Sequence, residues 1–222
     1  MKTKHSFVHV FFTLSILWGL AKPDPHPLQD YCVADNSKAQ HSLHMNGAPC
    51  INPTRATASH FTTSALSKPG NTDANIFGFN VTLANIANLP GLNTMGLTMA
   101  RVDLAPDGLV PPHAHPRASE VTICLQGTLL VGFVDTSFRM FSQHLRPGEA
   151  FVFPKGLIHF LYNIERKSPA VAVSGLSSQN PGAQLTPAAL FRSKPNIPDE
   201  ILTKAFQVTE QEIVRIRRNL GG

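Results

Sequence analysis

The stretch HAHPRASE, residues 113 to 120, places two histidines on either side of one alanine and a glutamate five positions after the second histidine. Side chains in an extended strand alternate between faces, so His113 and His115 are expected to point the same way. Pro116 lacks the backbone donor that a sheet needs and favours a turn. We therefore predict that one strand ends at HAH, that PRA forms a corner, and that Glu120 opens the next strand and turns back towards the histidines.

The region from Asn75 to about Ser177 is a succession of short runs rich in Val, Ile, Phe, Leu and Thr, separated by Gly, Pro and Asp. The connections are too short for crossover helices, so the strands are expected to pair antiparallel in an all-β sandwich or barrel. Several runs, such as EAFVFP, are apolar on both faces. This pattern predicts that the outside of the sheet is also covered, a neighbouring subunit being one candidate.

The sequence after Asn180 changes to helical spacing in TPAALF, PDEILTKAF and TEQEIVRIRRNL. Thr209 and Glu212 have the spacing of a capping box. One apolar stripe is expected to be buried over the barrel or against another subunit; it comprises Phe206, Ile213, Ile216 and Leu220. Three arginines are predicted to form a solvated face, with contact to acidic polysaccharide as the alternative; they are Arg215, Arg217 and Arg218.

The chain begins with the pattern of a signal peptide over residues 1–21. Lys2 and Lys4 precede an apolar run, and Ala21 is a small residue suited to cleavage. No later run has the length of a membrane span, so a secreted product is expected. The 222 residues, 42% of them hydrophobic, suffice for one well-filled core and exclude a disordered chain. The net charge of +5 is modest, and we predict no nucleic-acid partner.

Export determines how the cysteines are interpreted. Cys32 and Cys50 lie near the mature N-terminus and are predicted to pair in an oxidising compartment. Cys124 lies in the apolar run VTICL, where it is either a buried free thiol or a metal ligand, and the first reading is favoured. Asn80 begins the one glycosylation sequon that is not blocked by proline, so we predict a glycan there.

A third histidine joins the first two in the segment GEAFVFPKGLIHFLYN, residues 148–163. Pro154 and Gly156 predict a tight turn that delivers His159 to the start of an aromatic strand. In an antiparallel barrel this strand can lie beside the HAH strand. Three imidazoles and one carboxylate, with room for one or two waters, are typical of a redox or Lewis-acid site rather than a closed structural one. Such a donor set accepts iron, zinc, copper or nickel as well as manganese.

The segments GLVPPHAHPRASEVTICLQG, residues 108–127, and GEAFVFPKGLIHFLYN resemble the two motifs of cupins in the form typical of germins and germin-like proteins. LQDYCVAD, LPGLNTMGLTMARVDLAP and SSQNPG are similar to the same family, so the resemblance covers essentially the whole mature chain. It implies a jelly-roll cupin barrel with short C-terminal helices. Residues 22–222 would form one domain, with a disulfide-linked extension to about residue 60, the barrel over about 61–180 and the helices over about 181–222.

The resemblance also implies a cofactor, a compartment and an assembly. Manganese would be held by four ligands, which are His113, His115, Glu120 and His159. The protein would be secreted to the plant cell wall space, the apoplast, and would assemble as a homo-hexamer. Asn163 has two interpretations: it orients the metal ligands, or it satisfies backbone groups of the barrel.

The resemblance points to two activities. Germins that oxidise oxalate hold the substrate with two asparagines, and their positions align with Ala100 and Val110, which cannot donate a side-chain hydrogen bond. Superoxide dismutation, which yields hydrogen peroxide and suits a role in defence, is therefore expected instead. The alternatives are oxalate oxidation, nucleotide-sugar pyrophosphatase activity, against which the chain shows no phosphate-binding glycine-rich loop, and a non-enzymatic cell-wall or receptor protein.

Overall fold

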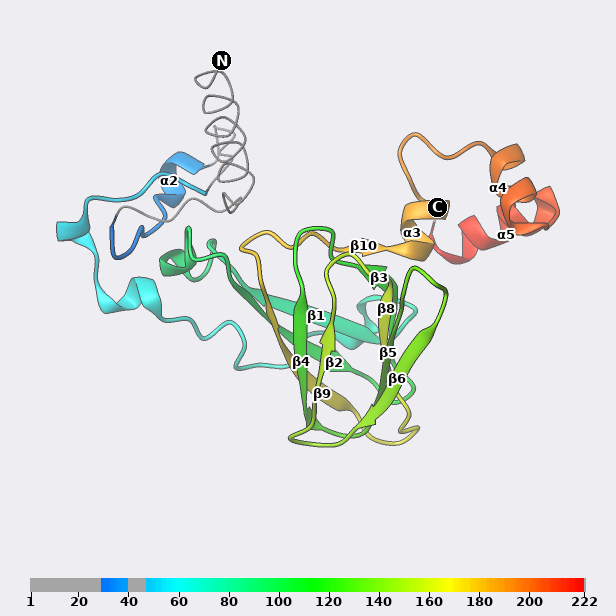
Figure 1. Ribbon diagram of the computed structural model, residues 1–222, viewed down its shortest axis with the longest axis horizontal. Helices are drawn as coiled ribbons and strands as arrows, with labels where there is room; N and C mark the ends of the chain where they lie inside the picture. Colours follow the sequence, from blue (N-terminus) through cyan, green and yellow to red (C-terminus); the bar gives the residue numbers. More distant parts are fainter. Residues whose placement is uncertain (1–28, 40–46, 222) are drawn as a thin grey trace, which may run out of the picture.

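Two antiparallel five-stranded sheets pack face to face in the computed structural model, which describes residues 29–39 and 47–221 (Figure 1). The strand orders are β1-β2-β9-β4-β7 and β10-β3-β8-β5-β6. The bounds are β1 Phe79–Ala84, β2 Thr98–Leu104, β3 Leu109–Ala114, β4 Glu120–Gln126, β5 Leu129–Val134, β6 Met140–Leu145, β7 Ala150–Phe153, β8 His159–Asn163, β9 Ala170–Leu176 and β10 Gln184–Leu185. The predicted all-β class and the antiparallel pairing are confirmed.

The inward side chains change from polar to apolar along the sheets. On β4, Glu120, Thr122 and Cys124 are all buried and alternate with exposed or half-buried neighbours. Around Cys124 lies the main apolar core, whose buried members are Val102, Leu104, Val110, Cys124, Leu129, Val131, Leu145, Phe153, Leu161, Ala170 and Ala172. The barrel interior therefore has an apolar end that stabilises the fold and a polar end that begins at Glu120.

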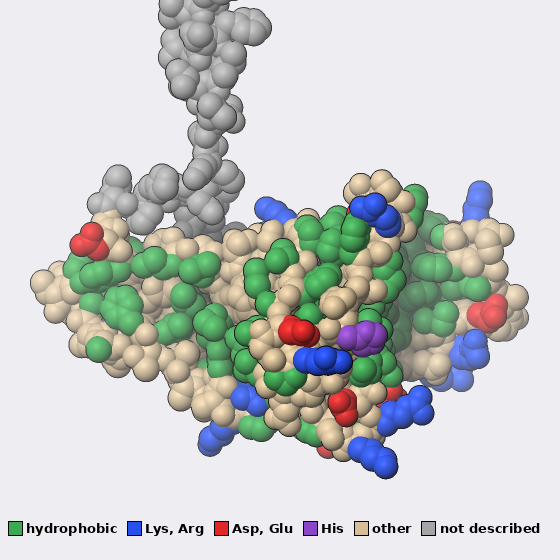
Figure 2. Space-filling view, turned by 60° about the horizontal axis from the view of Figure 1, so that its bottom comes forward, with side chains coloured by type: hydrophobic (Ala, Val, Ile, Leu, Met, Phe, Trp, Pro, Cys, Tyr) green, Lys and Arg blue, Asp and Glu red, His purple; other side chains and the backbone are tan. Residues whose placement is uncertain are grey.

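The outer face of the first sheet is apolar as well, as the sequence pattern predicts. Met99, Gly175, Val121 and Val152 form one row across β2, β9, β4 and β7. The side chains of Met99, Val121 and Val152 are 45%, 50% and 56% exposed. In the space-filling view, hydrophobic side chains reach the surface on both the barrel and the C-terminal tail (Figure 2). Surface of this kind favours contact with another protein surface.

Short 3-10 helices and a short α-helix precede or interrupt the first strands: α2 Asn36–Ala39, η1 Pro53–Arg55, η2 Ala58–Phe61, η3 Thr72–Ala74 and η4 Pro90–Leu92. The predicted disulfide joins Cys32 to Cys50 with an S–S distance of 1.99 Å. Asn93, which is fully buried, accepts from Ala48 N at 2.9 Å and donates to Ala48 O at 2.8 Å. These contacts attach the N-terminal extension to the loop before β2.

The tail consists of α3 Thr186–Phe191, α4 Asp199–Phe206 and α5 Glu210–Asn219. The capping box is confirmed, since Thr209 N donates to Glu212 Oε2 at 2.8 Å and Thr209 Oγ1 accepts from Glu212 N at 3.3 Å. These helices stand beside the barrel and follow β10 (Figure 1). They share an apolar cluster of buried Phe191, Leu202 and Ile213 with half-buried Leu190, Ile197, Val208, Ile216 and Leu220.

Part of the predicted stripe packs within the tail itself: Ile213 is fully buried there, whereas Ile216 and Leu220 are half-buried and Phe206, on α4, is 46% exposed. That a neighbouring subunit covers the rest of the stripe stays a prediction. The predicted solvated face is wrong for Arg217. Its Nη2 donates to Asp199 Oδ1 at 2.6 Å and to the backbone carbonyl of Ile197 at 2.7 Å, so it joins α5 to the start of α4.

Three predictions concern export: the signal peptide, the lack of a membrane span, and glycosylation at Asn80. The signal peptide over residues 1–21 lies outside the described residues. Among the described helices, none is both long and apolar enough to cross a membrane. Asn80 lies half-buried on β1, where its Nδ2 donates to the carbonyl of Asn71 at 3.4 Å, and its glycosylation stays a prediction.

Candidate metal centre

The two motifs meet because β3 pairs with β8. His113 stands near the end of β3 and His159 is the first residue of β8, and the two are direct partners in the antiparallel register. A shift in register between Val110 and His113 marks an irregularity just before the histidines. The expectation that the strand of His159 lies beside the HAH strand is confirmed.

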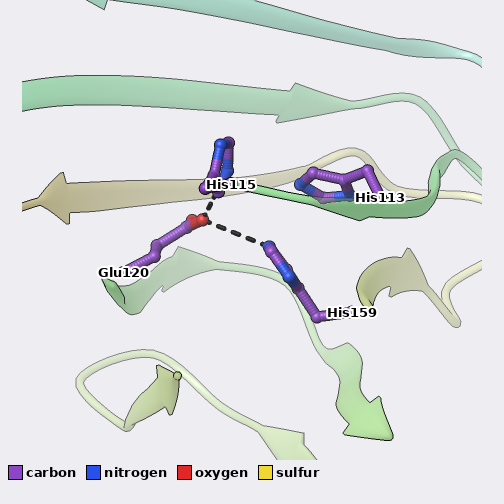
Figure 3. Close-up of side chains that lie close together, drawn as sticks. All are labelled: His113, His115, Glu120 and His159. Carbon is purple, nitrogen blue, oxygen red and sulfur yellow. Dashed lines mark ion pairs between the residues drawn. The ribbon is translucent and has the colours of Figure 1, made fainter. Parts of the chain in front are cut away.

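The turn at Pro116 brings the carboxylate back to the histidines. His115 follows the end of β3, residues 116 and 117 form a turn, and Glu120 is the first residue of β4. The ligand atoms of His113, His115, Glu120 and His159 all lie within 4.8 Å of one another. In Figure 3, Glu120 points between His115 and His159, with its Oε2 at 2.9 Å from His115 Nε2 and 3.3 Å from His159 Nε2.

The three imidazoles are oriented by backbone carbonyls. The Nδ1 of His113 donates to Pro111 O at 2.9 Å, that of His159 to Leu157 O at 2.9 Å, and that of His115 to Gly182 O at 2.5 Å. Because a carbonyl can only accept, each Nδ1 carries the proton. Each neutral ring therefore presents the lone pair of its Nε2 to the centre, which is the tautomer that a metal requires.

This arrangement leaves a gap that a cation fits. Glu120 Oε2 and His159 Nε2 are buried and have no hydrogen-bond partner among the described residues. Both atoms are acceptors in the neutral tautomer, so they cannot satisfy each other. Leaving such atoms unpaired costs about 1 to 3 kcal/mol each. A metal ion bound by all four groups removes that cost, so the donor set fits a metal.

Two residues that the sequence analysis did not single out hold Glu120 in place. Thr122 Oγ1 donates to Glu120 Oε1 at 2.8 Å and lies 2.7 Å from Ser174 Oγ. Both hydroxyl residues are fully buried. Thr122 lies two positions after Glu120 on the same face of β4, and Ser174 is its partner on β9. The period of two was a usable signal for Thr122, whereas Ser174 required the strand order.

The burial and the charges of the site shift its pKa values in different directions. Burial lowers the pKa of His113 to about 4. Burial also acts to lower the pKa of His115, but its contacts with Glu120 and with the Gly182 carbonyl outweigh this and raise it above the ordinary value. For Glu120, burial alone would raise the pKa, but the polar neighbours His115, His159 and Ser174 outweigh it and hold the pKa far below its usual range. Glu120 is therefore a carboxylate at neutral pH.

A cavity of about 360 Å³ adjoins the donors. His113, His115 and Glu120 form one part of its lining, and Ala100 and Val110 form another. The side chains of Ala100 and Val110 are only 4% and 5% exposed. A small molecule in this cavity would reach the centre past apolar walls.

Two other candidate residues lie elsewhere. The hydrogen bonds of Asn163 go to backbone, because its Nδ2 donates to Ala105 O and Ser168 O at 2.8 Å each and its Oδ1 accepts from Glu165 N at 3.0 Å. These contacts favour the interpretation that it supports loops rather than orienting the ligands. Cys124 is buried and free, and burial raises the pKa of its thiol. It lies in the main core and outside the cluster of four donors.

Comparison with known proteins agrees with this geometry. A cupin family model matches residues 64–214, so the fold and the His and Glu cluster define a cupin. "Germin-like protein subfamily 1 member 1" of Arabidopsis thaliana is 57% identical over 97% of this chain and 99% of its own length. "Germin-like protein 3-1" of Oryza sativa subsp. japonica is 53% identical over 96% of each chain. A solved oxalate oxidase is 40% identical, covers 90% of this chain and 98% of its own, and superposes with a TM-score of 0.83.

The chain therefore belongs to the germin-like proteins of the cupin family.

Proposed function

We propose that this protein binds one manganese ion at His113, His115, Glu120 and His159 and dismutates superoxide to dioxygen and hydrogen peroxide. The observation that carries the proposal is that four ligand atoms converge within 4.8 Å of one another, two of them, Glu120 Oε2 and His159 Nε2, buried without a hydrogen-bond partner among the described residues. Three backbone carbonyls accept from the Nδ1 atoms of the imidazoles and so direct each Nε2 to the centre. Bound manganese would supply reversible one-electron chemistry.

The chain's own contribution is to hold and orient the donors. Phe153 stacks on the ring of His159, with the ring centroids 4.4 Å apart. Thr122 fixes the carboxylate of Glu120 through Oε1 and leaves Oε2 for the ion. Supports of this kind keep the ligand geometry unchanged between two oxidation states.

The charge of the site suits a small monoanion. Three neutral imidazoles and one carboxylate around a divalent ion leave one net positive charge. Superoxide carries one negative charge and needs only an open coordination position. Among the described residues that line the cavity there is no Lys or Arg, so the positive charge that attracts superoxide would come from the metal.

Oxalate is less well suited to the same cavity. Ala100 and Val110, where oxalate-oxidising germins are expected to have asparagine, both line the cavity. At these two positions a dianion would contact apolar side chains in place of hydrogen-bond donors, which disfavours its binding. The 40% identity to an oxalate oxidase supports the fold and the donor set, and it does not by itself make oxalate the substrate of this chain.

Location and assembly complete the proposal. We infer a secreted, glycosylated protein of the apoplast that acts in defence and forms a hexamer. The exposed apolar row of Met99, Val121 and Val152 on the outer sheet face supports assembly, since monomers rarely leave such surface uncovered. Acidic wall polysaccharide could contact Arg215 and Arg218, which are exposed on α5.

The test uses the secreted protein loaded with manganese, and superoxide and oxalate are assayed on the same sample. Superoxide removal with peroxide formation, and no peroxide from oxalate, is the expected result. The matched control is Glu120→Gln, which keeps the size of the side chain but removes the charge that balances the ion. Unchanged activity in that variant, or robust oxalate oxidation in the native protein, would overturn the proposal.

A further inference from the structure

The cavity beside the donors is larger and more apolar than superoxide requires. Its lining includes Val81 and Leu83 from β1, Val102 from β2, Leu161 from β8 and Leu176 from β9. A diatomic anion gains nothing from such walls. A cavity of about 360 Å³ is in the size range of pockets that hold small organic molecules.

Charge is confined to one end of this cavity. His113, His115 and Glu120 stand there, and no Lys or Arg is found among the described residues that line it. The single net positive charge of a loaded site matches one carboxylate. A second anionic group on the same ligand would find no cation in the rest of the lining, whose polar side chains are the neutral Asn85, Thr98, Gln179 and Asn180, and an unbalanced charge is costly to bury.

The volume sets the size of the ligand. One water occupies about 30 Å³ of the liquid, so about 360 Å³ corresponds to roughly a dozen water-sized groups. A molecule of roughly ten non-hydrogen atoms would fill the space with its charged end at the metal.

The apolar wall also reaches the surface. Val81 and Leu83 are 40% and 37% exposed and lie on β1, the edge strand of its sheet. Val102 and Val110, deeper along the cavity, are 4% and 5% exposed. An apolar body can therefore enter along β1 and remain in contact with apolar side chains as far as the donors.

Another part of the wall is tied to the metal centre. Residues 179–183 line the cavity. Arg117 Nε donates to Asn180 O at 2.7 Å, and His115 Nδ1 donates to Gly182 O at 2.5 Å. Because these contacts fix the segment to the turn that carries His115, the cavity is formed before a ligand arrives, which reduces the entropy lost on binding.

We propose that the cavity binds a small aromatic or branched monocarboxylate. Its carboxylate binds the metal while its apolar body contacts Val81, Val110 and Leu161. This inference rests on the proposed metal site and names the class of organic ligand, substrate or effector, that the site takes beyond superoxide.

The experiment is titration calorimetry of the intact, manganese-loaded protein with four acids. Benzoate and 3-methylbutanoate are expected to bind at least about tenfold more tightly than acetate, because apolar contacts discriminate by about this factor per group. Benzoate and 3-methylbutanoate are also expected to bind more tightly than oxalate. Removing the metal should weaken benzoate binding, since its carboxylate loses its partner.

Two variants locate the ligand and one serves as the control. Val110→Asn places an amide in the wall near the donors, and Val81→Asn does so at the half-exposed entrance, where folding is little affected. Each is expected to weaken benzoate at least about tenfold. Val214→Asn, on α5 and 43% exposed, makes the same change away from the cavity and should leave affinity unchanged.

Superoxide removal measured on the same samples separates this inference from the proposed function. Selective benzoate binding that falls in Val81→Asn and Val110→Asn supports the inference, even in a protein without dismutase activity. Equal, weak binding of benzoate and acetate overturns it, even in an active dismutase. Benzoate binding that is unchanged in Val81→Asn and Val110→Asn overturns it as well.

Discussion

Replacing Thr122 by valine removes the hydroxyl that holds Glu120 while nearly preserving the shape of the side chain. That hydroxyl donates to the carboxylate at 2.8 Å and contacts Ser174 Oγ at 2.7 Å, and Thr122 is fully buried. A hydrogen bond to a charged group contributes about 1.5 to 3 kcal/mol. Since the carboxylate must keep its orientation to bind the ion, we expect manganese affinity to fall by about 10- to 100-fold.

The chain offers a matched control in Thr98. It is 1% exposed, and its Oγ1 has no hydrogen-bond partner among the described residues. Thr98→Val therefore removes a buried hydroxyl without breaking a bond, and we expect unchanged affinity and equal or greater stability. Affinity is measured by competition with a chelator, and folding by thermal unfolding of the metal-free protein. Equal manganese affinity in Thr122→Val and Thr98→Val would refute the role of Thr122.

Three further predictions concern pH, the tail and oxalate. The pKa of His115 is raised above 6.5 and that of His113 is lowered to about 4, so acidification protonates His115 first. Manganese affinity, measured by equilibrium dialysis, should therefore fall by about tenfold per pH unit below the pKa of His115. An affinity that does not change between pH 7.5 and pH 5.5 would contradict this. Arg217→Met should lower the free energy of unfolding by about 1 to 2 kcal/mol, a value discounted because Asp199 is partly exposed, and the melting temperature by about 2 to 4 °C per kcal/mol. The control Arg218→Met, at an exposed site, should change the free energy of unfolding by less than about 0.5 kcal/mol. An equal effect of both variants would count against the Arg217 contacts. The double variant Ala100→Asn with Val110→Asn should gain oxalate binding in calorimetry, whereas binding as weak as in the native protein would show that other walls exclude oxalate.

The convergence of the four candidate ligands was largely predictable from the sequence because three of them lie within the eight residues 113–120. The period of two fixes His113 and His115 on one face, and Pro116 ends the strand so that Glu120 can return. His159 required that two antiparallel strands be neighbours, which a barrel allows and the resemblance to germins implied. The four donors therefore converge as the sequence predicts.

The remaining features depend on strand order and on packing across long separations. Ser174 reaches the site only because β9 lies between β2 and β4. Arg217 looked like a solvated residue, since nothing near it in the sequence reveals that α4 begins against its guanidinium. Phe206 matched the helical period of α5, but the αL residue Gln207 ends α4 first and places it on a different helix. Such features need the folded chain.

Anomalous X-ray scattering at the manganese absorption edge, from crystals of the secreted protein, tests the central claim most directly. We expect one peak per chain, about 2 to 2.3 Å from Nε2 of His113, His115 and His159 and from Oε2 of Glu120. A peak at another place, no peak at the manganese edge, or one that lacks His159 as a neighbour would contradict it.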